Sequence, residues 1–495
     1  FKEKFYARVH GPNHHWWVFS VTALGTFMTT YDLGSVSMSL PRIMASFQTS
    51  VAVASWVLLA FLLTAAVLLL PAGRLGDIVG RKKVYNLGFL IFITGSALCA
   101  FSQSTTQLII FRIFQAIGAS MLQTNSFAII TAVFPDKERG KGLGMGSTIA
   151  GIGATAGPAI GGLLIAAVGW RGIFFLNVPI GLAGAIMAHL IIQEKLVSTP
   201  PDKIKRNFDI IGALLVAIVM ISLIIGMSMG QESNWTSKET AIILGITVLG
   251  VVAFPLFESR KANPLLDMNL FKNRTFSFNC IARIIMFLAI SANVLLMPFF
   301  LQIALGYSPA KAGLVIAPMS VVMAIVSPFS GWLCNYVTTR TLASLGMAIM
   351  GISLFIISRL SIHSGYFEII FLLSLLGFGH SVFQTPNNTS VMDSVTRDKY
   401  GIASGVLALC REVGRSLGTA LASTIVAASM FAMVGKVSLY NLRRDASILG
   451  QGDAMSALVD GIEKAYLVAA ILCVLGVIFT LSRGKTERDK GIHAR

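Results

Sequence analysis

The stretch GRLGDIVGRKK at residues 73–83 has a weaker second copy, GWLCNYVTTRT, at residues 331–341, which is 258 positions later. Another pair lies beyond it: GASMLQT at 118–124 resembles GHSVFQT at 379–385, which is 261 positions later. At the same offset of 261, glycines of the first half fall on glycines of the second: Gly140 on Gly401, Gly144 on Gly405 and Gly157 on Gly418. A near-constant offset indicates that the chain is built from two related halves.

Apolar runs surround this repeat from one end of the chain to the other. The 495 residues are 55% hydrophobic and only 12% charged, whereas a soluble domain is about 25% charged. A helix crosses a bilayer with about 17–25 residues, and fourteen runs reach this length. They are about 16–39, 51–72, 84–104, 107–134, 143–168, 172–193, 209–229, 240–257, 276–303, 309–334, 341–358, 366–392, 401–434 and 464–482. Because these runs do not alternate in polarity as barrel strands do, the sequence predicts an all-α integral membrane protein with fourteen transmembrane helices.

The repeat relates the first six runs to the last six and leaves the seventh and eighth without a counterpart. Those two runs lie between the charged linkers 193–209 and 258–276. We therefore predict an N-terminal six-helix bundle (1–193), linkers with two extra transmembrane helices (194–275), and a C-terminal six-helix bundle with a tail (276–495). Many secondary transporters consist of such repeats and bind their substrate between them.

The basic residues indicate orientation. The formal net charge is +17, and most Lys and Arg fall on one side of the membrane when the N-terminus is taken as cytoplasmic. This positive-inside bias predicts that both termini are cytoplasmic, in a multi-pass protein of the plasma membrane. The charge then serves orientation and attraction to membrane lipid, and we expect no nucleic acid partner. The five cysteines have neither metal-site nor disulfide spacing, so we expect no bound metal.

The 73–83 stretch resembles the signature of the major facilitator superfamily. The whole chain resembles most its fourteen-helix drug:proton antiporter family, the multidrug and quaternary-ammonium exporters. The resemblance implies a cytoplasmic gate formed by Gly73, Asp77, Gly80, Arg81 and Lys82, in which Asp77 faces a helix N-terminus near Gly401. A carboxylate is favourable at the positive end of a helix dipole. A basic loop that only sets topology is the alternative.

Residues 151–164, GIGATAGPAIGGLL, resemble the antiporter motif of the same family. The matching residues are Gly151, Gly157, Pro158, Gly161 and Gly162. Small residues let helices approach closely, and the proline removes a backbone hydrogen bond. Ordinary small-residue packing is the alternative interpretation. The stretches 170–182 and 301–319 also resemble the family, and we expect them to be fold signatures without chemistry of their own.

Asp32 is the one charged residue of its apolar run, within TTYDLGSV at 29–36. Charged side chains at membrane depth are costly and are functional candidates by default. Arg112, which begins an Arg-x-x-Gln-x-x-Gly pattern with Gln115 and Gly118, lies at a similar depth in its own run. An apolar environment favours the protonated form of a carboxyl group. The sequence therefore predicts that Asp32 carries a coupled proton, which Arg112 opposes in one state. A static ion pair that only joins helices is the alternative.

A second charged group lies in the thirteenth run, LCREVGRSLG at 409–418. Glu412 is expected to carry a proton or to attract substrate charge, with Arg411 and Arg415 beside it. A local ion pair between Glu412 and Arg415, three residues apart, is an equal alternative. Arg283 is expected to reach towards the cytoplasmic face, as long basic side chains near helix ends do.

The expected function is proton-coupled export of lipophilic, often cationic drugs by alternating access, without a cofactor and by a monomer. Ligand pockets are mostly apolar with a few placed polar groups. The expected cavity residues are Tyr31, Trp56, Phe61, Gln123, Asn125, Gln384 and Asn387. No phosphate-binding loop or nucleophile–base pair stands out, so we do not expect an enzyme. An exporter of a lipid or lipid-linked substrate with the same fold is one alternative, and a non-transporting receptor or scaffold is another.

Overall fold

The computed structural model describes residues 13–135, 139–197, 210–233, 237–259, 268–396, 400–434 and 451–484. Over these residues the regular structure is helical, without a strand, as the sequence predicts. The N-terminal set of helices is α2 (His14–Phe47), α3 (Val51–Val79), α4 (Arg81–Ala100), α5 (Thr105–Val133), α6 (Arg139–Val168) and α7 (Arg171–Ile191). The short α8 (Glu194–Val197) precedes the pair α9 (Ile210–Ser233) and α10 (Lys238–Ser259). After the turn η2 (Met268–Lys272), the C-terminal set is α11 (Arg274–Phe299) with η3 (Phe300–Ala304), α12 (Pro309–Leu333), α13 (Thr339–Ile357), α14 (Tyr366–Asp393), α15 (Tyr400–Val434) and α17 (Gln451–Ser482).

Among the described residues, twelve helices are long and apolar enough to cross a membrane. They are α3 to α7, α10, α11 with η3, α12 to α15, and α17. α2 is not among them, although it has 34 residues, because Asp32 and a series of Ser and Thr lower its hydropathy. Most of its residues from Val18 to Ile43 are buried, so these polar side chains face protein and not lipid.

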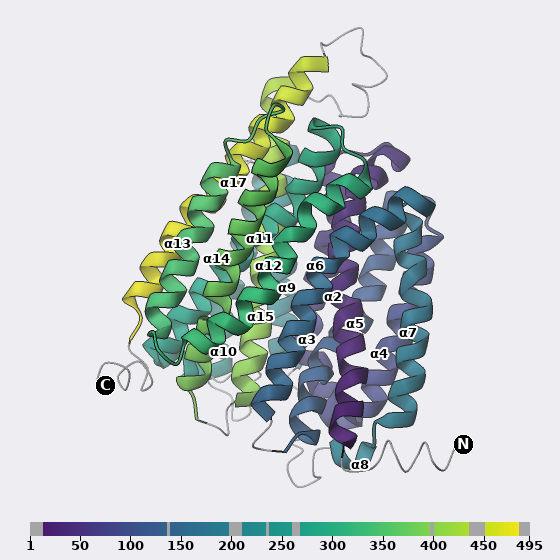
Figure 1. Cartoon of the computed structure of the whole chain (residues 1–495), viewed down its shortest axis with the longest axis vertical. Helices are drawn as coiled ribbons and strands as arrows, with labels where there is room; N and C mark the ends of the chain where they lie inside the picture. The colour runs from purple at the N-terminus through teal and green to yellow at the C-terminus, as the bar shows by residue number, and fades with distance from the viewer. Residues whose placement is uncertain are drawn as a thin grey trace.

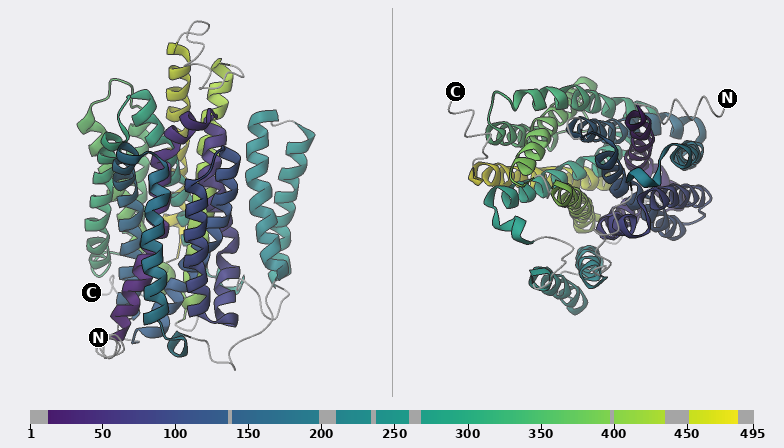
Figure 2. Two further views of the ribbon diagram at one scale, coloured as in Figure 1. Left: turned by 90° about the vertical axis from the view of Figure 1, so that its right-hand side faces the viewer. Right: turned by 90° about the horizontal axis from the view of Figure 1, so that it is seen from below.

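The two sets of helices lie side by side, with the N-terminal set on one side of the molecule and the C-terminal set on the other (Figure 1). α2 begins and α17 ends at the same end of the molecule, the lower end in Figure 1, which we call the termini end. The pair α9 and α10 stands outside both sets (Figure 2), and α9 packs against α3 and α15. The extra pair therefore touches one helix of each set.

Glycines that the repeat aligns make equivalent contacts in the two halves. A Cβ at Gly118 of α5 would lie 2.6 Å from the carbonyl oxygen of Gly88 on α4. In the second half, a Cβ at Gly379 of α14 would lie 2.8 Å from the carbonyl oxygen of Gly346 on α13. Such short distances are possible only without a side chain. The α4–α5 and α13–α14 pairs therefore pack alike, as an internal repeat requires.

Several helices are longer than the apolar runs that predict them, and α17 and α2 exceed their runs most. α17 begins at Gln451, whereas its run begins at 464, and α2 continues beyond residue 39 through Pro41 to Phe47. The added turns of α17 contain charged residues such as Asp460. A hydropathy run marks the part of a helix that suits lipid, but the helix itself can continue into water. The predicted boundaries were wrong at these two ends for that reason.

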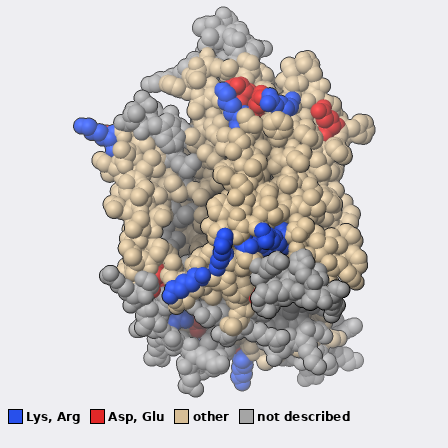
Figure 3. Space-filling model, turned by 90° about the vertical axis from the view of Figure 1, so that its left-hand side faces the viewer, with Lys and Arg blue, Asp and Glu red and all other residues tan. Residues whose placement is uncertain are grey.

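Charged side chains on the face shown in Figure 3 lie in two bands, one near the upper end and one in the lower half of the molecule. Between the bands the surface carries neither acidic nor basic side chains over most of its area (Figure 3). Large apolar side chains are exposed on several helices, for example Leu249, Ile325 and Phe371. An apolar belt between two charged rims is the surface expected of a protein that spans a bilayer.

Candidate functional site

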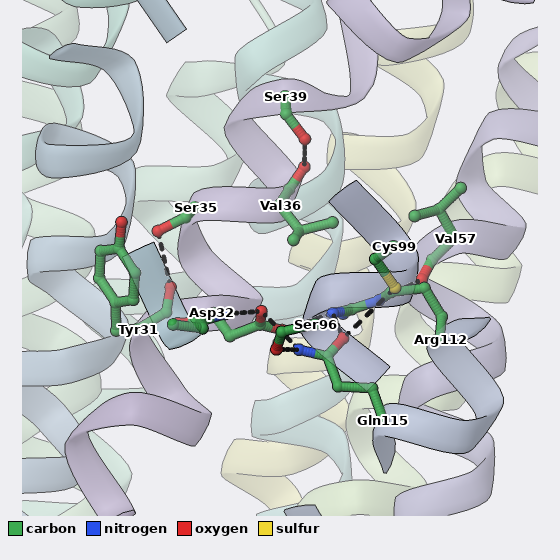
Figure 4. Close-up of polar contacts among 11 residues, drawn as sticks. Tyr31, Asp32, Ser35, Val36, Ser39, Val57, Ser96, Cys99, Arg112 and Gln115 are labelled. Carbon is green, nitrogen blue, oxygen red and sulfur yellow. Dashed lines mark hydrogen bonds and ion pairs between the residues drawn. The ribbon is translucent and has the colours of Figure 1, made fainter. Parts of the chain in front are cut away.

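The buried carboxylate of Asp32 joins three helices of the N-terminal set (Figure 4). The side chain lies in α2 and is 0% exposed. Its Oδ2 pairs with Nη1 of Arg112 on α5 at 2.5 Å. Its Oδ1 accepts hydrogen bonds from Nε2 of Gln115 on α5 at 3.1 Å and from Nδ2 of Asn177 on α7 at 2.7 Å. The carboxylate therefore has three donors, two on α5 and one on α7.

Arg112 has further partners of its own. Its Nη1 also donates to Oε1 of Gln115 at 2.6 Å, and its Nε donates to the carbonyl oxygen of Val57 on α3 at 3.2 Å. The guanidinium lies over the ring of Phe61, 4.2 Å from the centroid, which is a cation–π contact. Arg112 is thus held in place by α3 and α5 as well as by Asp32.

Gln115 extends the network to α4. Its Nε2 donates to Oγ of Ser96 at 2.7 Å (Figure 4). Two buried atoms of the site have no hydrogen-bond partner among the described residues: Arg112 Nη2 and Asn177 Oδ1. A buried polar atom without a partner costs free energy. The site therefore keeps hydrogen-bonding capacity that a rearranged state can use.

The structure brings Asp32 and Arg112 together at the similar depth that the sequence indicates. Asn177 was not predicted as a site residue, and it lies in the 170–182 stretch that was expected to carry no chemistry. That expectation was wrong, because Asn177 donates directly to Asp32. The signal was present: Asn177 is the one amide inside the apolar run 172–193, apart from Gln193 at its end.

The 73–83 stretch joins several helices at the termini end. Arg81 pairs with Asp77 at 3.0 Å, and its Nη1 donates to the carbonyl oxygen of Ala128 on α5 at 3.2 Å. Nζ of Lys82 donates to the carbonyl oxygen of His189 on α7 at 2.8 Å. These contacts hold α3, α4, α5 and α7 together.

Glycine is required at two positions of this stretch for two different structural reasons. A Cβ at Gly73 would lie 2.6 Å from Cγ2 of Thr124 on α5, so glycine lets α3 approach α5. Gly80 has a φ of +111°, which side chains disfavour, and it joins α3 directly to α4. The expected contact of Asp77 with the helix end near Gly401 falls on side chains outside the described part of the chain.

The 151–162 glycines place α6 between the two sets. A Cβ at Gly157 would lie 2.7 Å from the Tyr31 carbonyl oxygen of α2, and one at Gly161 would lie 2.9 Å from Cα of Ser35. A Cβ at Gly162 would clash with the carbonyl oxygen of Pro309 on α12. Gly151 is different, because nothing lies within 4 Å of a Cβ there. Three of the four glycines of the antiporter-like motif therefore serve close contacts, which join α6 to α2 and to α12 of the C-terminal set. Pro158, between them, lies inside α6.

Glu412 forms a second charged cluster. It is buried, and its Oε1 accepts from Nε of Arg411 at 2.8 Å and lies 3.7 Å from Nη1 of Arg415. Nη2 of Arg411 donates to Oε1 of Gln123 on α5 at 2.9 Å. α15 is thereby linked to the N-terminal set.

The other expected cavity residues do not form one group. Phe61 belongs to the Asp32 site and Gln123 to the Glu412 cluster. The rest lie apart: Tyr31 stacks on Phe27, Trp56 packs near Leu63, Ala66 and Val413, Asn125 bonds within α5, Gln384 is half-buried, and Asn387 bonds to Asn279.

Arg283 does not reach towards the surface, and that expectation was wrong. It is 4% exposed, and its Nε donates to the carbonyl oxygen of Leu407 on α15 at 2.9 Å. Its Nη1 donates to Oδ1 of Asn388 on α14. The guanidinium is bonded inside the C-terminal set, because α11 turns this face towards α14 and α15.

Arg483, which follows α17, is buried as well. Its Nη2 donates to Oγ1 of Thr339 at the start of α13, at 2.7 Å. The repeat aligns Thr339 with Arg81. A guanidinium from the last helix therefore lies at the position where the second copy of the motif lacks an arginine. The linear sequence gave no sign that Arg483 supplies the guanidinium at this position.

The sequence matches the Major Facilitator Superfamily over residues 22–419 and 280–493. It is 32% identical over 467 residues to the riboflavin transporter RibZ of Clostridioides difficile (strain 630), which covers 94% of this chain and 97% of that protein. It is 33% identical over 410 residues to the multidrug resistance protein Stp of Mycobacterium tuberculosis (strain ATCC 25618 / H37Rv). That match covers 82% of this chain and 75% of that protein. The fold is similar to that of a bacterial homologue of the human lysosomal transporter Spinster in an inward-facing, unoccupied conformation. The TM-score is 0.69 at 18% identity, over 95% of this chain and 97% of that one. The chain belongs to the Major Facilitator Superfamily.

Proposed function

We propose that this chain is a proton-coupled exporter of small lipophilic compounds, with Asp32 as the proton carrier. The observation that supports this proposal is the fully buried Asp32 carboxylate with its three donors on α5 and α7. A residue that only packs needs no charge at this depth, and ionisable groups inside membrane proteins usually serve ion or substrate pathways.

Protonation of Asp32 removes its charge attraction to Arg112. Arg112 keeps its hydrogen bonds to Gln115 and Val57 and its cation–π contact with Phe61. α2 is then held less firmly to α5 and α7. α2 packs against α6, and α6 packs against α12 of the other set. A shift of α2 therefore reaches the interface between the sets. We propose that the two sets act as bundles that rock about this interface, so that proton uptake and substrate exchange alternate between the two sides.

We further propose fourteen spans, because α2 and α9 run alongside the twelve apolar helices (Figures 1 and 2). The termini end is proposed to be cytoplasmic, because basic loops are retained on that side. In a bacterial cell the protein then lies in the plasma membrane.

Cysteine labelling tests this topology. Lys195 in α8 and His363 between α13 and α14 are exposed at opposite ends of the molecule, and the five native cysteines are buried. A membrane-impermeant maleimide is expected to label His363→Cys in intact cells, and Lys195→Cys only after permeabilisation. Equal labelling of both in intact cells would rule out the proposed orientation.

The termini-end gate gives another expectation. Asp77→Asn keeps the volume of the side chain but removes the negative charge that pairs with Arg81. A partly exposed i,i+4 pair contributes only about 0.5 kcal/mol to stability, so the variant is expected to express normally. If Asp77 holds this end closed, transport slows and thiol reagents reach the interior from this end more quickly. Asp460→Asn is the matched control, because Asp460 pairs with Lys464 with the same spacing at the opposite end. Equal transport and thiol access in both variants would count against the gate.

The substrate class is tested by uptake into inverted vesicles under an imposed pH gradient. A panel of lipophilic drugs, riboflavin and fluorescent phospholipids separates the candidates. Uptake of a drug driven by the gradient supports the proposal. Movement of phospholipid alone would favour a lipid exporter, and no gradient-driven movement of any compound would favour a receptor or scaffold.

Riboflavin is a specific second candidate substrate. The relative named a riboflavin transporter matches over nearly the full length of both chains, at 32% identity. Multidrug resistance proteins match at similar identity over less of their own length. Gradient-driven uptake of riboflavin, with no drug of the panel accumulated, would favour this candidate.

A further inference from the structure

The region around Phe287, on α11, gathers more positive than negative charge inside the protein. Arg283 and Arg415 lie over its ring, at 5.1 and 5.4 Å from the centroid, and the ring of His380 lies 6.1 Å away. Arg411 and Glu412 complete the group through the Arg411–Glu412–Arg415 ion pairs. Glu412 pairs with two of the three arginines, Arg411 and Arg415, and none of the three pairs with another carboxylate among the described residues.

This excess of charge lies deep in the molecule. With a rise of about 1.5 Å per residue, Arg283 lies about 14 Å and Arg411 about 17 Å along their helices from the termini end. Gln123, which accepts from Arg411, lies about 15 Å from the same end of α5. The hydrocarbon core is about 30 Å thick, so these groups are within it. Uncompensated charge at this depth is costly, and it marks a functional site.

The arginines also keep unused hydrogen-bond donors. Among the described residues Arg415 makes no hydrogen bond, and its contacts are the 3.7 Å ion pair and the face of Phe287. Nδ1 of the buried His380 has no partner there either. The side chains of Arg411 and Arg415 keep 15% and 17% of their accessible surface. A guanidinium with free donors matches the oxygens of a carboxylate, sulfonate or phosphate.

The position of the cluster fits a substrate site. Arg411 and Arg415 are four residues apart and share one face of α15, and Arg411 bonds to Gln123 of the other set. Between them in the sequence, on the other side of α15, Val413 packs with Trp56, Leu63 and Ala66 of α3. At the level of the two arginines, α15 therefore contacts the N-terminal set through a polar bond on one face and apolar side chains on another.

We propose that Arg283, Arg411 and Arg415 bind a negatively charged group of the exported substrate, which is an amphiphilic organic anion. This inference rests on the proposed export function, and it reverses the cationic preference that the family resemblance implies. Glu412 holds two of the arginines in place and leaves the cluster a net positive charge. The anionic group can belong to a soluble compound or to a lipid headgroup, since both present the same oxygens.

Two fluorescent probes with nearly the same aromatic body test the charge. 8-Anilinonaphthalene-1-sulfonate carries a sulfonate, and N-phenyl-1-naphthylamine does not. Binding is measured with the full-length protein in phosphatidylcholine nanodiscs, without a pH gradient. Arg415→Gln is expected to weaken binding of the sulfonate about tenfold or more, the effect of losing one interaction with a charged group, and to leave the neutral probe unchanged. Arg359→Gln, at an exposed arginine that pairs with Glu463, is the matched control and is expected to change neither.

Competition on the wild-type protein gives a result that does not depend on a variant. Decanesulfonate is expected to displace the bound sulfonate probe, and decyltrimethylammonium is not. Phosphatidylglycerol in the nanodisc separates the two sources: it blocks the probe if the ligand is a lipid headgroup and leaves binding unchanged if the ligand is soluble. Equal displacement by both decyl compounds, or equal loss of both probes in Arg415→Gln, would overturn the proposal. A protein that selects the anion but shows no gradient-driven flux would refute proton-coupled export and leave the anion site standing.

Discussion

Asp32→Asn protein is expected to fold and to bind substrate, but its proton-driven export should fall to the level of protein-free liposomes. The amide imitates the protonated carboxyl group in shape and charge, and it cannot release a proton. Exchange of labelled for unlabelled substrate across the membrane should survive, because exchange needs no net proton movement. The measurements are melting temperature, substrate binding, exchange and pH-driven flux of the reconstituted protein.

The surroundings of Arg112 are the reason to expect a folded variant. Breaking a buried ion pair usually costs about 3–5 kcal/mol, because the remaining charge is left without a partner. Here Arg112 keeps hydrogen bonds to Gln115 and Val57 and its contact with Phe61. A proton carrier must tolerate a neutral residue at position 32 in part of its cycle, and these contacts provide for that.

The outcomes separate coupling from a static pair. A static Asp32–Arg112 pair predicts loss of folding or expression in Asp32→Asn. Glu463→Gln, which breaks an exposed pair with Arg359, should leave both stability and flux nearly unchanged. An Asp32→Asn variant that pumps at the wild-type rate would remove Asp32 from the mechanism, and Glu412 would be the next candidate.

Gly157→Val is expected to have the largest effect on folding. Its Cβ would lie 2.7 Å from the Tyr31 carbonyl oxygen, 2.8 Å from Cα of Gly34 and 2.9 Å from the backbone nitrogen of Ser35. These are backbone atoms and cannot rotate away, so α2 and α6 must separate. Separation also breaks the hydrogen bond from Ser35 Oγ to the Gly157 carbonyl oxygen. Overpacking of this kind costs about 3 kcal/mol or more.

Gly151→Ala is the matched control in the same helix. Nothing lies within 4 Å of a Cβ at Gly151, and alanine suits a helix better than glycine does. The five cysteines are buried, so a thiol-reactive dye reports unfolding of either variant on heating. We expect Gly157→Val to unfold well below wild type and Gly151→Ala at or slightly above it. Equal unfolding temperatures for the two variants would show that α2 and α6 are not held together at this point.

Much of the fold could be predicted because it depends on local chemistry. Hydropathy located the helices, and the offset of about 260 residues identified two related halves. The rise of a helix is constant, so the depth of a residue follows from its place in an apolar run. That rule placed Asp32 and Arg112 at the same level, and the structure joins them at 2.5 Å.

The sequence alone determined an all-helical membrane protein, predicted two related halves, and identified Asp32 as a charge that requires a partner. Only the tertiary structure decided which side of each helix faces which neighbour. The positions of Asn177 beside Asp32, of Arg283 beside Leu407 and of Arg483 beside Thr339 therefore came from the structure. Each contact joins residues more than 100 positions apart. Helix rotation and neighbour choice depend on how all the helices pack together, and no single stretch of sequence records that sum.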